Sequence, residues 1–528
     1  MKHSQYKTRR WNDEVYGSRI ERVFSWKPWN KLFKAKILED ELNKAKTSED
    51  RSKIEAKIIK YKLKAGAKML AYARDHSWHV GNITHVDPDG LMSAKLLKMF
   101  FEKEDEYDYS FGLFHSYQET EHKDISRYTF KDLKLTAPTD RRSGALLIST
   151  DLRMSECYCE RLDHLQQMLD APLLSIDHHI RGKRINTGPK KPKNEGVKPD
   201  PYSIEDIIME VEFKDYWKRD NAGGKAHDWG IEEKTAPQPF LDIDTCVNRY
   251  PATLLVYNMV ELASDKVKNP PNLKKMIPFA AIGLMGDKAD LKLGKDKPLK
   301  KTEEIIEEAK RMVGKRRLSL LKDWIEMIGY SIPDLLPEVW KEISSTDDVR
   351  DLLKPDKTIP RFGKSLSEER RRIKKKFWRS VTPKMEKYGV YHYRTESTLR
   401  SNDYGYNNYN FSMGVSLANV LSEENRSDFF AICAKTKNNH DFINSEERRA
   451  YPEVYKVYLR RSDGKVNLND DVLEYMCKGR YKKGPERKGG RAAGEVVFYT
   501  EEDLALGLKK YTKRCIELRK EERFTGNT

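Results

Sequence analysis

Cysteine is scarce in this chain, with six residues among 528. No two of them form a CxxC pair, so the sequence predicts neither a disulfide framework nor a zinc ribbon. Long apolar runs are also missing, since no stretch approaches the roughly 18 uninterrupted apolar residues of a membrane span. The basic start MKHSQYKTRRW is followed by no apolar stretch and does not resemble a signal peptide. We therefore expect a cytoplasmic protein with no membrane role.

Charge, in contrast, is abundant. Lys and Arg number 100 and Asp and Glu 83, which leaves a net charge of +17. A positive balance of this size attracts polyanions, so nucleic acid, anionic lipid and acidic protein are all candidate partners on charge alone. The length of 528 residues exceeds the roughly 100–200 residues of one ordinary domain, and 38% of the residues are hydrophobic. We therefore expect two packed domains with connecting helices.

The first part of the chain predicts helices followed by a parallel sheet. Residues 1–75 contain two helical patterns on either side of the polar TSED at 47–50, and they predict a basic hairpin. Its expected role is to cover the edge of the next domain, with its basic faces as a candidate nucleic-acid contact. Residues 76–300 alternate short apolar runs with helical stretches, which indicates an α/β domain with a mainly parallel sheet. A basic insertion at 181–240 interrupts this domain and opens with a loop rich in Pro and Gly at 181–200.

The remainder of the chain predicts a connector and a second domain. Residues 301–390 are charged and helix-forming and predict a helical connector. Within it, EERRRIKKKFWR at 368–379 is expected to form a solvated helix face. Residues 391–528 combine apolar strands with helices and predict a smaller α/β domain. An aromatic segment at 404–411 contains tyrosines that either stack on bases or pack at a domain interface.

Four apolar runs in the first domain end in Asp or His, at 78–90, 145–152, 171–179 and 276–290. Each run predicts a buried strand, and the carboxyl ends of parallel strands meet at one edge of a sheet. Singly, each polar residue has an ordinary role, such as a helix N-cap for Asp or a hydrogen-bonded structural His. Together, so many carboxylates would repel one another unless cations neutralised them. Mn²⁺ and Mg²⁺ accept carboxylate and imidazole ligands, so the four runs predict a metal site.

These motifs resemble those of the DHH phosphoesterase superfamily. HVDPDG looks like its first motif, STD at 149–151 like its second, DHH at 177–179 like the motif that names it, and GLMGDKAD at 283–290 like its fourth. The His before the Asp pair and the form GDxxD are most similar to the archaeal RecJ-like branch. In the last part of the chain, YKVYLRRSDGKVNL resembles the central strand of the DHH-associated domain, and GGRAAGE resembles its closing glycine motif. That motif usually reads Gly-Gly-His, whereas here Arg491 follows Gly490.

The resemblance implies a site for two Mn²⁺ or Mg²⁺ ions. His85 and Asp87 would hold one ion, and Asp151 would bridge the two. Asp177 would orient an imidazole, and Asp290 is either a similar supporting residue or a helix cap. The ligands implied for the second ion are Asp89, His178 and Asp287. The implied catalytic set is Asp87, Asp89, Asp151, His178, His179 and Asp287.

Substrate contacts are implied in both domains. His179 would contact the phosphate or protonate the leaving oxygen. The basic loop that follows would track a nucleic-acid backbone through Arg181 and Arg184. The arginines of the second domain can bind phosphate bidentately and its glycines let the backbone approach a phosphate, although surface charge alone explains the arginines equally well. The candidates there are Arg460, Arg461, Gly489, Gly490 and Arg491.

Three functions are compatible with this pattern. The resemblance, the net charge and the basic loop favour a Mn²⁺-dependent exonuclease that releases nucleoside monophosphates from single-stranded DNA or RNA. Replication or repair proteins are the expected partners of such an enzyme. A second hypothesis is a phosphodiesterase for short oligonucleotides or a phosphatase for small nucleotides. A third is a replication scaffold that keeps the fold but not the chemistry, and it predicts the loss of metal ligands, whereas every ligand position is filled here.

Overall fold

The chain is described from a computed structural model, and its elements fall into two compact units. Among the described residues, the division lies between Leu318 and Ser319. The residues that the structure describes are 48–75, 79–102, 109–113, 145–151, 173–177, 240–244, 250–287, 289, 299–332, 335–395, 409–437, 450–463, 465–478, 481, 486–489 and 493–525.

The first unit contains a five-stranded sheet in which every neighbouring pair of strands is parallel. The strand order is β2-β1-β3-β4-β5. Consecutive residues such as Leu146, Leu147 and Ile148 are all buried, as expected for a parallel sheet that is covered on both faces. The strands are β1 (His79–Thr84), β2 (Tyr109–Leu113), β3 (Ala145–Thr150), β4 (Leu173–Asp177) and β5 (Phe240–Asp244).

This strand order reverses between β1 and β3. The chain runs outward from β1 to β2, returns to β3 on the other side of β1, and then continues to β4 and β5. In doubly wound sheets the crevice beyond the carboxyl ends of the strands at such a reversal is where ligands bind. The topology therefore places a candidate site beyond the ends of β1 and β3.

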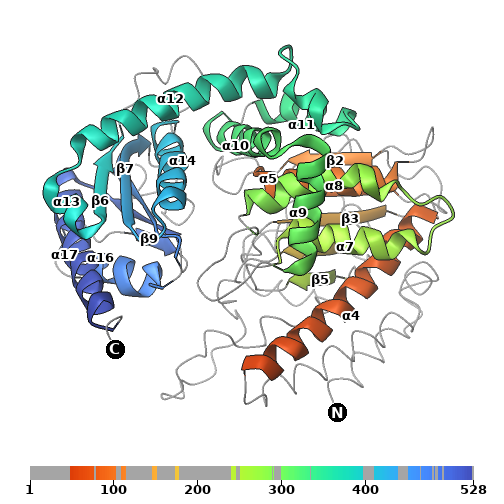
Figure 1. Cartoon of the computed structure of the whole chain (residues 1–528), viewed down its shortest axis with the longest axis horizontal. Coiled ribbons are helices and arrows are strands. Elements are labelled where there is room, and N and C mark those ends of the chain that lie inside the picture. The colour runs from red at the N-terminus through yellow and green to blue at the C-terminus, as the bar shows by residue number, and fades with distance from the viewer. Residues whose placement is uncertain are drawn as a thin grey trace, which may run out of the picture. The chain divides into compact units, whose positions relative to one another are not determined.

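Within the described residues, five helices accompany the sheet (Figure 1). Helix α5 packs against α7 and α8, α8 packs against α9, and α4 packs against α7. Gly283 and Gly286 permit this packing, because a Cβ atom at either position would overlap Thr253 or Pro88. The helices are α4 (Ser48–Asp75), α5 (Pro88–Phe101), α7 (Ala252–Ser264), α8 (Leu273–Gly286) and α9 (Lys300–Val313).

Two segments of this unit differ from the sequence-based expectation. The apolar run within 276–290 was expected to be a strand, but it lies in helix α8, which is 14 residues long. All residues of α8 from Pro278 to Met285 are buried, so the sequence does not show the alternation of apolar and polar residues that identifies a helix. An uninterrupted apolar run does not distinguish a strand from a buried helix. Strand β5, in contrast, begins inside the segment 181–240 that was expected to be a polar insertion. The remaining residues of that insertion lie outside the described part of the chain.

Helix α4 covers the second helical pattern of the expected amino-terminal hairpin, and the first pattern lies outside the described residues. No helix in the described residues is both long and apolar enough to cross a bilayer.

A run of helices leads into the second sheet. Helix α12 buries Leu366, Ile373 and Phe377 on its inner face, which is the pattern of an amphipathic helix against a core. The helices of this run are α10 (Lys315–Ser331), α11 (Leu336–Ser345), the short 3-10 helix η6 (Val349–Leu353), α12 (Thr358–Ser380) and α13 (Pro383–Tyr388).

The second unit is built around a mixed five-stranded sheet of order β6-β7-β8-β10-β9. Strands β6 and β7 are parallel, and the other pairs are antiparallel. Helix α14 (Tyr409–Glu424) contacts β7 and β8, and helix α17 (Glu501–Thr525) contacts β6 and β10. The strands are β6 (Val390–Arg394), β7 (Phe429–Lys437), β8 (Glu453–Arg460), β9 (Glu486–Gly489) and β10 (Ala493–Phe498).

The core of this unit lies between the sheet and its helices. Alternate residues of β8, such as Val457 and Leu459, contribute to one cluster with Tyr511 and Cys515 of α17. The short helices η8 (Leu468–Leu473) and α16 (Glu474–Cys477) complete that cluster. The expected fold class, a mainly parallel α/β domain and a smaller α/β domain linked by helices, is therefore confirmed.

Candidate metal centre

Three predicted ligands meet beyond the carboxyl ends of β1 and β3. His85 directly follows β1, and its amide donates to the carbonyl oxygen of Thr150 at 3.2 Å. Asp151 directly follows β3, and its amide donates to the carbonyl oxygen of Ile176 in β4 at 2.9 Å. These bonds continue the parallel ladders past the strand ends. The sheet therefore holds the backbones of both residues in place.

Asp87 is positioned by the first turn of α5. It is the N-cap of that helix, and its Oδ1 accepts a hydrogen bond from the amide of Gly90 at 3.0 Å. A Cβ atom at Gly90 would overlap the carbonyl of His85, so the tight turn from β1 into α5 requires glycine there. The capping role and the clustering with His85 are therefore compatible.

The ligand atoms of His85, Asp87 and Asp151 all lie within 4.8 Å of one another. His85 Nδ1 is 3.0 Å from Asp87 Oδ2 and 3.7 Å from Asp151 Oδ2. The Asp151 side chain is 1% exposed and that of Asp87 is 23% exposed. One imidazole nitrogen and two carboxylates form a donor set that suits Mn²⁺ or Mg²⁺, so these residues fit a divalent ion.

The backbone of Asp151 is unusual. Its φ is +56°, in the left-handed region that residues other than glycine seldom adopt. Such a conformation carries a cost that the surrounding structure must offset, and it is found disproportionately at functional sites. At the end of β3 it directs the Asp151 carboxylate toward His85.

The electrostatics of the cluster also favour a cation. Burial raises the pKa of the Asp151 carboxyl well above its usual range. The negative charges of Asp87, Asp89 and Asp177 raise that pKa further. Burial also acts to raise the pKa of Asp87, but the charge and hydrogen bond of His85 outweigh it and lower the pKa below the usual range. A divalent ion would let all these carboxylates ionise together.

Asp89 has a role that the sequence did not predict. Its Oδ2 and Oδ1 accept hydrogen bonds from the amides of Ala252 and Thr253, each at 2.9 Å. These are the first two residues of α7, whose own N-cap is Pro251 and makes no side-chain cap. Asp89 therefore caps α7 from another helix. The sequence signal for this role was the proline before α7, because a proline N-cap has no side-chain acceptor for the first amides of the helix.

The other predicted ligands are placed only in part. Asp177 ends β4, is 1% exposed and pairs in register with Asp244 of β5. Asp287 is the C-cap of α8, and its amide donates to Gly283 at 3.1 Å, so it follows a helix and not a strand. Among the described residues, the three-ligand group includes neither of them nor Asp89, and their ligation stays a prediction. His178, His179, Arg181, Arg184 and Asp290 lie outside the described residues.

The candidate phosphate contacts of the second unit divide into two cases. Arg460 ends β8 and is half-buried, opposite Ala493 of β10. Gly489 ends β9, and Gly490 and Arg491 lie outside the described residues.

Arg461 is a structural residue. Its guanidinium lies over the ring of Phe429 at 4.3 Å and pairs with Asp463 at 2.6 Å and with Glu522. It is 1% exposed. The burial and pairing of its guanidinium count against a contact between Arg461 and substrate, and that contact stays a prediction.

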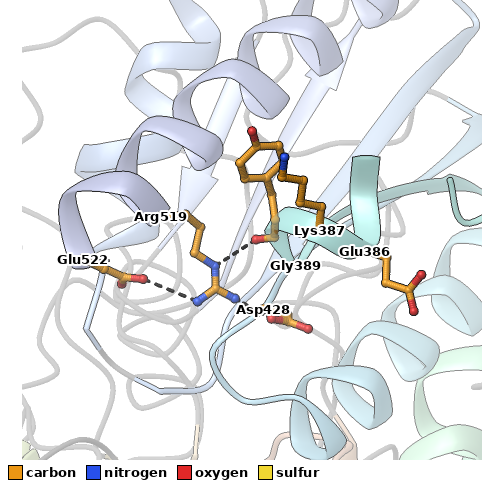
Figure 2. Close-up of a pocket in the computed structure, with 7 residues that line it drawn as sticks. Glu386, Lys387, Gly389, Asp428, Arg519 and Glu522 are labelled. Carbon is orange, nitrogen blue, oxygen red and sulfur yellow. Dashed lines mark hydrogen bonds and ion pairs between the residues drawn. The ribbon is translucent and has the colours of Figure 1, made fainter. Parts of the chain in front are cut away.

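A hollow of about 340 Å³ opens elsewhere in the second unit, beside Gly389 at the start of β6. Figure 2 shows Arg519 between Glu522 and Asp428. Its Nε also donates to the carbonyl oxygen of Tyr388 at 3.1 Å. These contacts join α17 to the segments around Tyr388 and Asp428. The negative charges of Asp428 and Glu522 neutralise the positive charge of Arg519. We therefore interpret the hollow as the rim of a structural ion-pair cluster.

Several solved structures match this chain at low sequence identity. One is a DHH-domain protein described as a member of a family of ribosomal proteins, with 14% identity, a TM-score of 0.52, and coverage of 90% of this chain and 97% of that one. RecJ from Thermus thermophilus in complex with Mn²⁺ is 13% identical, with a TM-score of 0.45 and coverage of 87% and 55%. CDC45 from Entamoeba histolytica is 11% identical, with a TM-score of 0.39 and coverage of 86% and 99%.

No family model and no curated protein sequence matches the chain. At 14% identity, the first of these likenesses shows a shared fold. A shared fold of this kind does not by itself imply a shared function.

Proposed function

We propose that this chain is a metal-dependent phosphoesterase of the DHH type that acts as a Mn²⁺-dependent exonuclease on single-stranded nucleic acid. The observation that carries the proposal is the convergence of His85, Asp87 and Asp151 at the reversal of the strand order. Buried carboxylates with shifted pKa values in a crevice are a signature of catalytic and metal sites. The fold likeness to a DHH-domain protein and the four sequence motifs support the same class.

In the proposed site, His85, Asp87 and Asp151 would hold the first ion, with Asp151 shared with a second. The ligands of the second ion are Asp89, His178 and Asp287. Two such ions, when bound, would supply Lewis-acid chemistry that activates water for phosphodiester hydrolysis. The protein positions the ligands, with Gly90 fixing one oxygen of Asp87 through its amide. Asp177 orients an imidazole, and His179 contacts the phosphate or protonates the leaving oxygen.

A polymeric substrate is favoured by charge. The net charge of +17 and the basic loop after His179, which includes Arg181 and Arg184, suit a chain of phosphates. The proposed phosphate contacts in the second unit are Arg460, Gly489, Gly490 and Arg491. Replication or repair proteins are the proposed partners. Binding through several phosphates weakens steeply with salt, whereas binding of a dinucleotide does not.

The test is a product ladder. Single-stranded DNA and RNA labelled at either end, and a dinucleotide, are incubated with the full chain and Mn²⁺, with and without chelator. Stepwise shortening that the chelator abolishes is the expected result, and the label released first gives the polarity. Cleavage of the dinucleotide alone would instead indicate a short-substrate phosphodiesterase. No cleavage by a chain that still binds Mn²⁺ would contradict the enzymatic proposal and favour a scaffold.

A further inference from the structure

Helix α12 in the second unit carries a cationic stripe on its outward face. Lys364, Arg371, Lys375 and Trp378 are separated by seven, four and three residues, so they lie on one side of the helix. Arg379 flanks them. All five side chains are exposed, whereas Ile373 and Phe377 on the opposite side are buried. We call these five outward residues the α12 stripe.

The cations of the stripe differ from those on the inner flanks of the same helix. On the inner flanks, Arg370 pairs with Asp323 at 3.5 Å and Arg372 pairs with Glu369 at 2.5 Å. Lys374 similarly pairs with Glu424 at 2.5 Å. These cations are neutralised within the fold.

On the stripe, in contrast, the one carboxylate near a cation is Glu368, 4.0 Å from Arg371, and both of those side chains are 72% exposed. Within the described part of the chain, no carboxylate lies in ion-pair range of Lys364, Lys375 or Arg379. Among the described residues, the outward positive charge is thus compensated only at Arg371.

Trp378 adds an aromatic surface to this charge. It is 40% exposed, and it is the one large apolar side chain that is exposed among the described residues. Its ring packs edge-on against Phe377 at 4.9 Å and against Tyr391 at 5.9 Å, which holds it in place. Proteins that bind single-stranded nucleic acid combine partly exposed aromatic rings with nearby cations. The bases stack on the rings, and the cations contact the phosphates.

We propose that the α12 stripe binds single-stranded nucleic acid, with the cations on the phosphate backbone and a base stacked on Trp378. From Lys364 to Arg379 the stripe extends about 22 Å at 1.5 Å per residue, enough to follow several nucleotides. This contact lies outside the metal centre and requires no hydrolysis. It is therefore independent of metal, and its success or failure can be separated from that of the exonuclease proposal.

A lipid surface fits the stripe less well. A helix that lies in a bilayer interface inserts a broad apolar face, and here that face, with Leu366, Ile373 and Phe377, is already buried in the protein. Only Trp378 remains to enter a bilayer. An acidic protein would use the charges of the stripe but would gain no base stacking.

The test measures binding of a fluorescent oligothymidylate to the full chain by anisotropy, in chelator and over a salt series. The stripe variant carries two substitutions, Arg371→Glu and Lys375→Glu. The control variant carries Lys513→Glu and Lys520→Glu on α17. Both lysines of the control are exposed, and the two variants change the net charge by the same amount. We expect the stripe variant to weaken binding at least tenfold and to lower the salt slope by about 1.4, the contribution of two phosphate contacts on a single strand. Trp378→Ala should weaken binding about fivefold or more, while Trp378→Phe retains most of it.

Other outcomes would overturn the proposal. Equal losses in the stripe and control pairs would mean that overall charge alone binds the strand. Unchanged binding in the stripe variant would exclude α12 as a nucleic-acid site. The same variants are tested on phosphatidylserine vesicles and on polyglutamate, and losses confined to either of these would assign the stripe to a membrane or to an acidic partner.

Discussion

His85 Nδ1 lies 3.7 Å from Asp151 Oδ2, although the two residues follow different strands. The sheet register explains this proximity, because Thr84 and Thr150, the last residues of β1 and β3, are paired. The hydroxyl groups of these threonines are also 2.7 Å apart. A site that depends on strand register should be sensitive to changes in its backbone as well as to changes in its ligands.

Removing the charge of Asp87 should abolish Mn²⁺ binding and hydrolysis with little effect on stability. Asn is as good an N-cap as Asp, so Asp87→Asn keeps the cap on α5 but weakens the ligand. Asp87→Ala should lose the activity and also about 1 kcal/mol of stability with the cap. Calorimetric Mn²⁺ titration, hydrolysis assays and urea unfolding in chelator separate the two effects. Full activity in Asp87→Asn would overturn the metal-centre assignment.

Asp89→Ala should destabilise the protein even without metal. Its carboxylate accepts two amide hydrogen bonds at the start of α7, and leaving these donors without acceptors should cost about 1–3 kcal/mol. Urea unfolding in chelator measures this cost directly. If Asp89 acted only as a metal ligand, the variant would match the native chain in chelator and differ only when Mn²⁺ is present.

Gly90→Ala should disturb the metal centre through the backbone. The added Cβ would overlap the carbonyl of His85, so the turn between β1 and α5 must shift. We expect a loss of about 1–3 kcal/mol and weaker Mn²⁺ binding. Gly314→Ala is the matched control, since its φ of +96° strains a side chain but no atom lies within 4 Å of the added Cβ. The control should lose stability and keep its Mn²⁺ affinity, and equal Mn²⁺ affinity in both variants would contradict the argument.

The Arg461–Asp463 pair should contribute to stability in a pH-dependent way. Burial acts to raise the pKa of Asp463, but the hydrogen bond and charge of Arg461 outweigh it, so the folded-state pKa lies below the unfolded value of about 3.9. A lowered pKa means that the contribution is fully present above pH about 4 and declines as the pH falls through the folded-state pKa. Asp463→Asn should therefore be less stable than the native chain at neutral pH, and the difference should shrink in acid. A difference in urea midpoint that is unchanged between these conditions would exclude this linkage.

Much of the first sheet could be predicted from local sequence. The runs that form β1, β3 and β4 are short, apolar and end in polar residues, which is typical of buried parallel strands. The run that forms α8 is also apolar, but it is buried on all sides, so its sequence lacks the helical spacing of polar residues. Strand β5 was missed because it follows directly on a polar segment. Composition thus identified buried segments but did not always show whether a segment forms a strand or a helix.

The role of Asp89 shows a different limit. Its position two residues after Asp87 predicts a metal ligand, a prediction that stays open. The structure adds that its oxygens accept the first two amides of α7, a helix that begins far along the chain. The sequence contains both partners but no local signal that they meet. Arg461 is similar, because its pairing with Glu522 and its stacking on Phe429 require the packed second unit.

The sequence by itself determined which residues have metal-binding chemistry and that most of them follow strands, because residue type and hydrophobic pattern are local properties. It also determined the excess of positive charge and the helical character of α12. Only the tertiary structure decided that His85, Asp87 and Asp151 converge, because strand order and register arise from contacts between distant segments. Likewise, only packing decided which cations of α12 are neutralised and which remain on its outward face beside Trp378, because ion pairing depends on the neighbouring helices.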